Sequence, residues 1–246
     1  MNLYFLLEGK TERFFYARFL DYFFGQRLQA VEFADAAQAN QYYLVSSAGY
    51  PFIYTGSRRG SSGDAVLKNA ILDINSHPVY DYLIVCLDAD NTTVAEREAE
   101  FDRHIQLLAG QGVRLNPRCA YQLIVQNRCI ETWFLGNRKL FKQNPTSEPL
   151  RAYVAYYNVK RNDPEQMGNF DDTYTHQDFH LQYLRAMLRE RRLNYQKQLP
   201  DSVTMTDYLE QLVKRAESPE KHIASFAQWL SFCQYLNSRL LADDQS

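Results

Sequence analysis

The sequence lacks any apolar run long enough to cross a membrane, and its longest apolar runs have the length of a β-strand. The run over residues 3–7 ends at Glu8, which is too soon for the apolar core of a signal peptide, and no basic stretch precedes it. We therefore expect a cytoplasmic protein that does not associate with a membrane.

Paired cysteines are also lacking, and none of the chain's cysteines forms a C-x-x-C motif. The four are Cys86, Cys119, Cys129 and Cys233. Cys86 lies in an apolar run typical of a buried strand, and we expect four buried thiols rather than disulfides or zinc ligands. His176 and His180 are four residues apart, but no third ligand at a suitable spacing favours a zinc site.

An excess of charge of one sign is lacking as well. The chain has 27 Lys and Arg and 29 Asp and Glu, which gives a formal net charge of -2. Any surface that binds nucleic acid must therefore be a local patch. Such a patch is expected to be small, or shared with a partner or with a second copy of the chain in a homodimer. Repeats and low-complexity tracts are absent, and 46% hydrophobic residues is an ordinary globular composition.

What is present is an alternation of strand and helix patterns. Continuous apolar runs over residues 3–7 and 82–87 predict strands covered on both faces, and helices are expected from Thr11 to Gly25 and over about 94–109. This order predicts an α/β fold with a mainly parallel sheet flanked by helices. Further predicted strands are 42–45, 52–54 and 121–125, and further predicted helices are about 64–75 and 129–135.

From about residue 138 the pattern becomes helical. The expected helices cover residues 149–157, 177–192, 206–216 and 219–241, with a polar loop over 158–175. We therefore expect a core of residues 1–137 and a helical C-terminal extension of residues 138–246.

Acidic residues follow the two clearest strands. Glu8 and then Glu12 come after the first strand, Asp88 and Asp90 come after the second, and Glu131 follows the next strand. The carboxyl ends of strands in an α/β sheet meet at one crevice, where ligands bind. Residues two apart on an extended chain point to the same side, so Asp88 and Asp90 can face one point.

Carboxylates held close together favour a cation between them. Two charges about 4 Å apart repel by about 4 kcal/mol at an effective dielectric near 20, so such acids take up protons or bind a cation. Oxygen ligands without nearby cysteine or histidine suit Mg²⁺ or Mn²⁺, which clamp phosphate oxygens and activate water for attack on phosphorus. The alternative for each acid is helix capping or exposure to solvent.

Lys10 lies in the same loop as Glu8 and can neutralise a scissile phosphate, although a surface lysine is the alternative. Gly9, Lys10 and Thr11 also match the end of a P-loop. That motif requires an earlier glycine, where this chain has Tyr4 inside the strand. We therefore do not expect this loop to hydrolyse nucleotides.

Two groups of basic residues are candidates for contact with a nucleic-acid backbone. Arg58 and Arg59 lie in a loop over residues 56–63, among small residues that allow close approach. The second group is a dense basic run formed by Arg189, Arg191, Arg192 and Lys197. The alternatives are a solvated flexible loop and a solvated helix end.

Three segments resemble a known family. LLEGKTERFF (residues 6–15) and IVCLDAD (residues 84–90) resemble the Toprim domain of topoisomerases, primases and related nucleases. Glu12 and RCIETWFL (residues 128–135) resemble, more particularly, the small stand-alone RloB-like Toprim proteins of bacterial defence loci, which are related to the OLD-family nucleases. The resemblance covers roughly residues 1–137 and implies a Toprim-like Rossmannoid core.

The resemblance also implies roles for the acids. Glu8 matches the family's general base or metal ligand, Asp88 and Asp90 match its metal-binding pair, and Glu12 and Glu131 match additional acids of the nuclease branch that could hold a second metal. The sequence departs from the family where Asn91 and Thr92 follow the second aspartate, because a further acid is common there. The resemblance therefore leaves open whether one or two metals bind.

The function that follows is an Mg²⁺- or Mn²⁺-dependent endonuclease acting on DNA or RNA, with tRNA among the candidates. Family members are toxin-like effectors of anti-phage defence, often encoded beside an ABC-type ATPase that acts as sensor and partner. A non-catalytic module that docks on the ATPase is the main alternative. A strand-passage or primer-making enzyme is disfavoured, because the companion domains of those enzymes are missing.

Overall fold

The computed structural model describes residues 1–34, 38–47, 49–56 and 65–243, and the chain forms two compact units. The first unit comprises residues 1–87, 95–125 and those from 235 on, and the second comprises residues 88–94 and 126–234. The sequence places a single boundary after residue 137. The second unit takes in residues 88–94 and 126–137, which that boundary assigns to the core.

A five-stranded parallel sheet forms the centre of the first unit, which confirms the α/β prediction. Its strand order is β2-β3-β1-β4-β5. The strands are β1 (Asn2–Leu7), β2 (Gln29–Val31), β3 (Gln41–Ser46), β4 (Tyr82–Asp88) and β5 (Ala120–Gln126). All six residues of β1 are buried, as expected for the central strand of a sheet covered on both faces.

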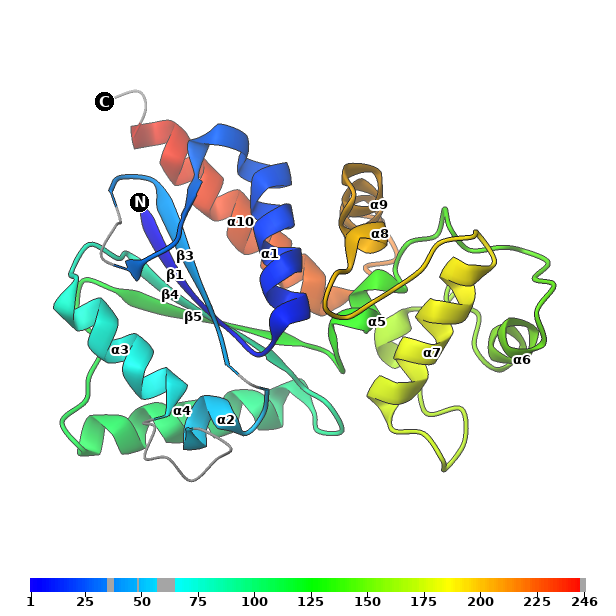
Figure 1. Cartoon of the computed structure of the whole chain (residues 1–246), viewed down its shortest axis with the longest axis horizontal. Coiled ribbons are helices and arrows are strands. Elements are labelled where there is room, and N and C mark those ends of the chain that lie inside the picture. The colour runs from blue at the N-terminus through cyan, green and yellow to red at the C-terminus, as the bar shows by residue number, and fades with distance from the viewer. Residues whose placement is uncertain (35–37, 48, 57–64, 244–246) are drawn as a thin grey trace. The chain divides into compact units, whose positions relative to one another are not determined.

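Helices cover both faces of this sheet, with α1 on one face and α3 and α4 on the other (Figure 1). The helices of the unit are α1 (Lys10–Phe24), the 3₁₀ turn η1 (Gly25–Arg27), α2 (Phe52–Thr55), α3 (Val66–Ser76) and α4 (Val94–Gly110). Gly25 ends α1 with a φ of 59°, a backbone conformation that favours glycine.

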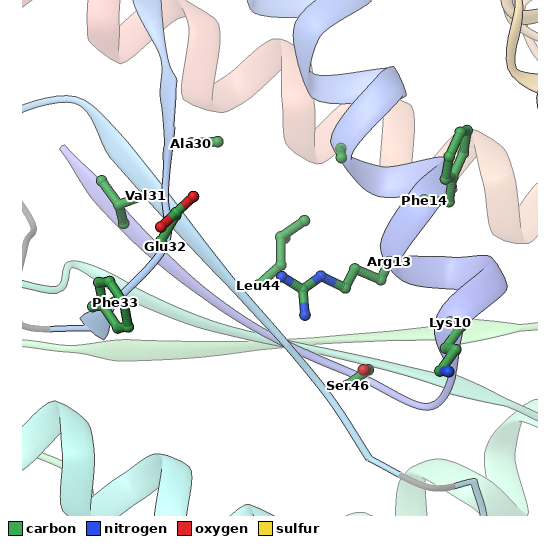
Figure 2. Close-up of a pocket in the computed structure, with 10 residues that line it drawn as sticks. Lys10, Arg13, Phe14, Ala30, Val31, Glu32, Phe33, Leu44 and Ser46 are labelled. Carbon is green, nitrogen blue, oxygen red and sulfur yellow. The ribbon is translucent and has the colours of Figure 1, made fainter. Parts of the chain in front are cut away.

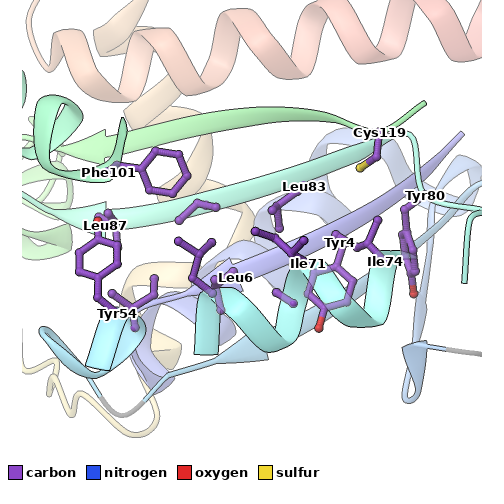
Figure 3. Packing of buried hydrophobic residues seen from close by; sticks show 14 residues of the cluster. Tyr4, Leu6, Tyr54, Ile71, Ile74, Tyr80, Leu83, Leu87, Phe101 and Cys119 are labelled. Carbon is purple, nitrogen blue, oxygen red and sulfur yellow. The ribbon is translucent and has the colours of Figure 1, made fainter. Parts of the chain in front are cut away.

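The core shows why the sequence folds in this way. On one face, Tyr4 and Leu6 of β1 pack with Ile71 and Ile74 of α3 and with Phe101 of α4 (Figure 3). On the other face, Phe5 of β1 contacts Tyr16 of α1 and Tyr42 of β3, with ring centroids 5.9 and 6.4 Å away. Alternate residues of one strand thus fill both layers, and each large side chain buried contributes about 1.5–3 kcal/mol.

The predicted strand over residues 52–54 is wrong, because these residues form the short helix α2. A three-residue apolar run fits a strand or a helix equally well. Here Pro51 precedes the run, and the backbone N–H groups of Tyr54 and Thr55 donate to its carbonyl. This turn starts a helix.

The second unit is helical within the described residues. Its elements are α5 (Ile130–Phe134), α6 (Glu148–Tyr156), the 3₁₀ turn η3 (Pro164–Gln166), α7 (His176–Arg189), α8 (Asp201–Thr204), α9 (Thr206–Ala216) and α10 (Ala224–Asp243) through Gln234. The predicted start of the last helix, residue 219, is five residues too early. Lys221 and Ile223 have φ values of 52° and 51°, so the chain turns before α10 begins.

All four cysteines are buried and free, as the sequence predicts. Among the described residues, no helix combines the length and the apolar character that crossing a lipid bilayer requires.

Candidate functional site

Glu8 lies at the carboxyl edge of the sheet, immediately after β1. Leu7 is opposite Ser46 of β3 and Cys86 of β4, so these three neighbouring strands end at the same edge. The Glu8 carbonyl accepts hydrogen bonds from Ser47 Oγ at 2.9 Å and from the Gly49 N–H at 3.0 Å. The backbone of Glu8 is therefore fixed by the chain that follows β3.

The Glu8 carboxylate contacts Tyr50, whose side chain packs with an arginine and a glutamate in a cluster that the sequence did not predict. The backbone N–H of Tyr50 donates to Glu8 Oε1 at 3.2 Å, and its hydroxyl donates to Glu100 at 2.8 Å. Arg97 lies 4.1 Å from the centre of the Tyr50 ring and pairs with Glu100 at 2.6 Å. No local signal reveals this cluster, because its members are 42 and 50 residues apart.

The Glu12 side chain lies next to Gly9, in the loop that carries Glu8. Its side chain is buried in the first turn of α1, where a negative charge is favourable. A Cβ atom on Gly9 would lie 2.7 Å from Glu12 Oε2, so any larger residue there would require this carboxylate to move. Lys10, the next residue, is exposed. The structure thus brings Glu12 and Gly9 together and leaves the Lys10 ammonium in solvent.

In the second unit, Asp88 and Asp90 lie on a turn that is braced by the segment after β5. The N–H of Ala89 donates to the Gln126 carbonyl at 3.0 Å, and that of Asp90 donates to the Arg128 carbonyl at 2.8 Å. Asp90 has a φ of 55°, which aspartate tolerates better than most residues. The left-handed turn replaces the extended geometry on which the sequence argument relied, so alternation does not decide where the two side chains point.

Glu131 is almost fully buried, with 1% of its surface exposed, and its counter-charge is Lys197. Tyr195 donates its hydroxyl to Glu131 Oε1 at 2.9 Å, and Lys197 Nζ lies 3.3 Å from the same oxygen. Burial lowers the pKa of Lys197, but the negative charges, that of Glu131 foremost, outweigh it and raise the pKa overall. The sequence grouped Lys197 with a basic surface run; the structure gives it this internal partner.

His180 belongs to the core of the second unit. Its Nδ1 lies 2.7 Å from Thr132 Oγ1 and its Nε2 lies 3.4 Å from the Met167 carbonyl. Burial lowers the pKa of His180 to about 3, so the ring is neutral at ordinary pH. Both ring nitrogens therefore serve packing, in line with the expectation that this histidine is not a zinc ligand.

The arginines predicted to contact nucleic acid differ in their surroundings. Arg58 and Arg59 lie outside the described residues. Arg191 holds the chain before α6, donating to the carbonyls of Leu140 at 3.0 Å and Phe141 at 3.4 Å. Arg189 and Arg192 are exposed near the end of α7.

The donor chemistry of the predicted acids fits a hard divalent cation, since every donor is a carboxylate oxygen. Within residues 1–34, 38–47, 49–56 and 65–243, however, no three or more His, Cys, Asp and Glu side chains form a group that could hold a metal ion. Glu131 already has the ammonium of Lys197 as its cation. The structure therefore supplies suitable ligand types, but it shows no assembled metal site among the residues it describes.

Comparisons with protein-family models, with curated proteins and with solved structures find no match to this chain. The resemblance to Toprim proteins stays a prediction from the three sequence segments.

Proposed function

We propose that this protein is a cytoplasmic, Mg²⁺-dependent endonuclease that hydrolyses phosphodiester bonds in DNA or RNA. One observation carries the proposal. β1 and β4 are adjacent parallel strands that end at the same edge, Glu8 is the first residue after β1, and Asp88 is the last residue of β4. The carboxyl edge of such a sheet is where α/β proteins bind their ligands.

Each acid has a role in this proposal. Glu8 accepts a proton from the attacking water, and the N–H of Tyr50 keeps its carboxylate in place. Lys10 binds the phosphodiester through its exposed ammonium. Asp88 and Asp90 would hold Mg²⁺, the role that the sequence resemblance implies for this pair. When bound, this ion supplies positive charge to the phosphate oxygens and makes a coordinated water more acidic.

The proposed setting is anti-phage defence, in which the protein acts as a toxin-like effector of an ABC-type ATPase. This part of the proposal is supported by the sequence resemblance alone. The substrate is a cellular or phage nucleic acid, with tRNA among the candidates.

The test is a cleavage assay on plasmid, single-stranded DNA and total tRNA with Mg²⁺ or Mn²⁺. Glu8→Gln should slow cleavage by at least about 100-fold, the usual range for losing a proton-transfer group. Asp88→Asn should also slow cleavage, because it removes the charge of a proposed metal ligand. Glu98→Gln is the matched control, because Glu98 is an exposed acid on α4. Equal cleavage by the wild type and Glu8→Gln would show that this site is wrongly assigned.

A second candidate is a non-catalytic module that docks on the ATPase. The ion pair between Glu131 and Lys197 favours it, because one predicted ligand is already neutralised without a metal. No cleavage of any substrate by the wild type, together with a stable complex with the ATPase, would support this reading over the nuclease.

A further inference from the structure

An open groove of about 890 Å³ lies in the first unit, between α1 and the strands β2 and β3 (Figure 2). Lys10 and Arg13 project into it from the first turns of α1, and Ser46 reaches it from the end of β3. Glu32 and Phe33, which follow β2, line its other end. None of these groove residues was a candidate at the sequence level except Lys10.

The groove carries positive charge that the protein leaves available. Lys10 and Arg13 are exposed, and none of the ion pairs between described residues uses either side chain. Among the described residues that line the groove, Glu32 is the one acid, against two cations. Two cationic side chains that line the same groove favour an anionic ligand, and arginine can donate two parallel hydrogen bonds to a phosphate group.

The groove also presents a flat apolar ring to solvent. Phe33 is 65% exposed, so its ring contributes little to the core. Figure 2 shows it with Glu32 at one end, Lys10 and Ser46 at the other, and Arg13 between them. An exposed aromatic ring in a groove that also carries cations is an arrangement with which proteins stack bases and hold the backbone of a single strand.

The position of the groove relates it to Glu8. Lys10 is two residues beyond Glu8, and Ser46 is opposite Leu7, the last residue of β1. The Lys10 end of the groove therefore borders the carboxyl edge of β1. A phosphate held by Lys10 would therefore lie near that edge.

We propose that this groove binds one nucleotide of a single nucleic-acid strand, with the phosphate on Lys10 and Arg13 and the base stacked on Phe33. The inference rests on the proposed nuclease function and deepens it, because it makes the substrate single-stranded at the site. A base within a duplex hides both faces in the stack, whereas a base in a loop or an end can stack on a side chain. The groove volume lies within the range of small-ligand sites, about 300–1,000 Å³.

The test is equilibrium binding of fluorescent single-stranded DNA and RNA oligonucleotides, and of a duplex of the same sequence, in the presence of EDTA. Arg13→Ala should weaken single-strand binding about tenfold and make its salt dependence shallower. Phe33→Leu should also weaken it about tenfold, and Phe33→Trp should keep it, because stacking needs an aromatic face. Arg103→Ala is the control, since Arg103 is exposed on α4, away from the groove.

The inference is overturned if the wild type binds the duplex as tightly as the single strand, if Arg13→Ala binds like the wild type, or if Arg103→Ala loses as much affinity as Arg13→Ala. Because EDTA prevents metal-dependent cleavage, the binding result does not depend on the catalytic proposal. Loss of cleavage in Asp88→Asn with unchanged binding by Arg13→Ala would retain the nuclease and reject the groove. Unchanged cleavage by Asp88→Asn with weakened binding by Arg13→Ala would reject the catalytic assignment and retain the groove.

Discussion

Gly9 has no side chain, and this absence allows the Glu12 carboxylate to lie against the loop that follows β1. Its φ and ψ of -146° and -173° are extended and open to any residue, so backbone freedom does not explain it. The reason is steric, because Glu12 Oε2 occupies the place of a Cβ atom. The sequence motif of an acid, a glycine and a second acid three residues later thus has a physical meaning: the glycine admits the second carboxylate.

Gly9→Ala should therefore lower the free energy of unfolding by about 1 kcal/mol, because the buried Glu12 carboxylate must move aside. In the Glu12→Ala background the same change should cost almost nothing. Urea denaturation of the two single variants and the double variant measures this coupling. Gly110→Ala is the control, since a Cβ there meets no atom within 4 Å. Additive effects of Gly9→Ala and Glu12→Ala would contradict the steric explanation.

The site residues that the sequence could not predict are those whose partners are distant along the chain. Glu8, Glu12 and Asp88 follow recognisable strands, and their positions relative to those strands are as expected. Tyr50 and Lys197 gave no such signal, because their residue numbers differ by 42 and 66 from those of their partners Glu8 and Glu131. Such contacts depend on tertiary packing, which composition and periodicity do not encode.

At the scale of elements, periodicity predicted the long helices and the central strands. α9 occupies residues 206–216 as expected, and the first strand and helix differ by about one residue from their predictions. The predictions failed where short segments or turns decide the structure, as at residues 52–54 and 219–223. The polar segment 158–175 also contains a structured turn, η3, which polarity alone concealed.

Turn η3 brings a buried acid to the start of α10. Glu165 Oε1 accepts hydrogen bonds from the backbone N–H of Ser225 at 3.0 Å and from its Oγ at 2.5 Å. Ser225 Oγ in turn accepts from the Asn127 N–H and from Trp133 Nε1. Burial raises the pKa of Glu165 to about 7, against an ordinary value of 4.5.

This raised pKa predicts a pH-dependent stability. The folded state holds the Glu165 proton more tightly than the unfolded state, so stability is highest below pH 4.5 and falls as the pH rises toward 7. The loss from this group alone is roughly 3 kcal/mol. Glu165→Gln should remove that slope in urea denaturation between pH 5 and 8, whereas Glu210→Gln, at an exposed position, should keep it. An unchanged slope in Glu165→Gln would show that another group causes the dependence.

At the scale of the whole molecule, positive and negative charges nearly balance, and the side chains proposed to bind nucleic acid are confined to small regions. The formal net charge is -2, so long-range attraction does not bring a polyanion to this protein. Contact with nucleic acid must then depend on a few cations that form no internal ion pair. Arg191 is a weaker candidate for such contact, because its guanidinium already donates hydrogen bonds to the carbonyls of Leu140 and Phe141.

The salt dependence of single-strand binding distinguishes the groove from the basic run near the end of α7. Neutralisation of the one phosphate that Lys10 and Arg13 are proposed to hold predicts a slope of log affinity against log salt of about -0.7. Each further arginine that contacts a phosphate makes the slope steeper by about 0.7. Titrations at several salt concentrations should therefore give the shallow slope for the wild type and for the Arg189→Ala/Arg192→Ala variant alike. A steep wild-type slope that this double variant reduces would place the nucleic acid on the α7 run instead.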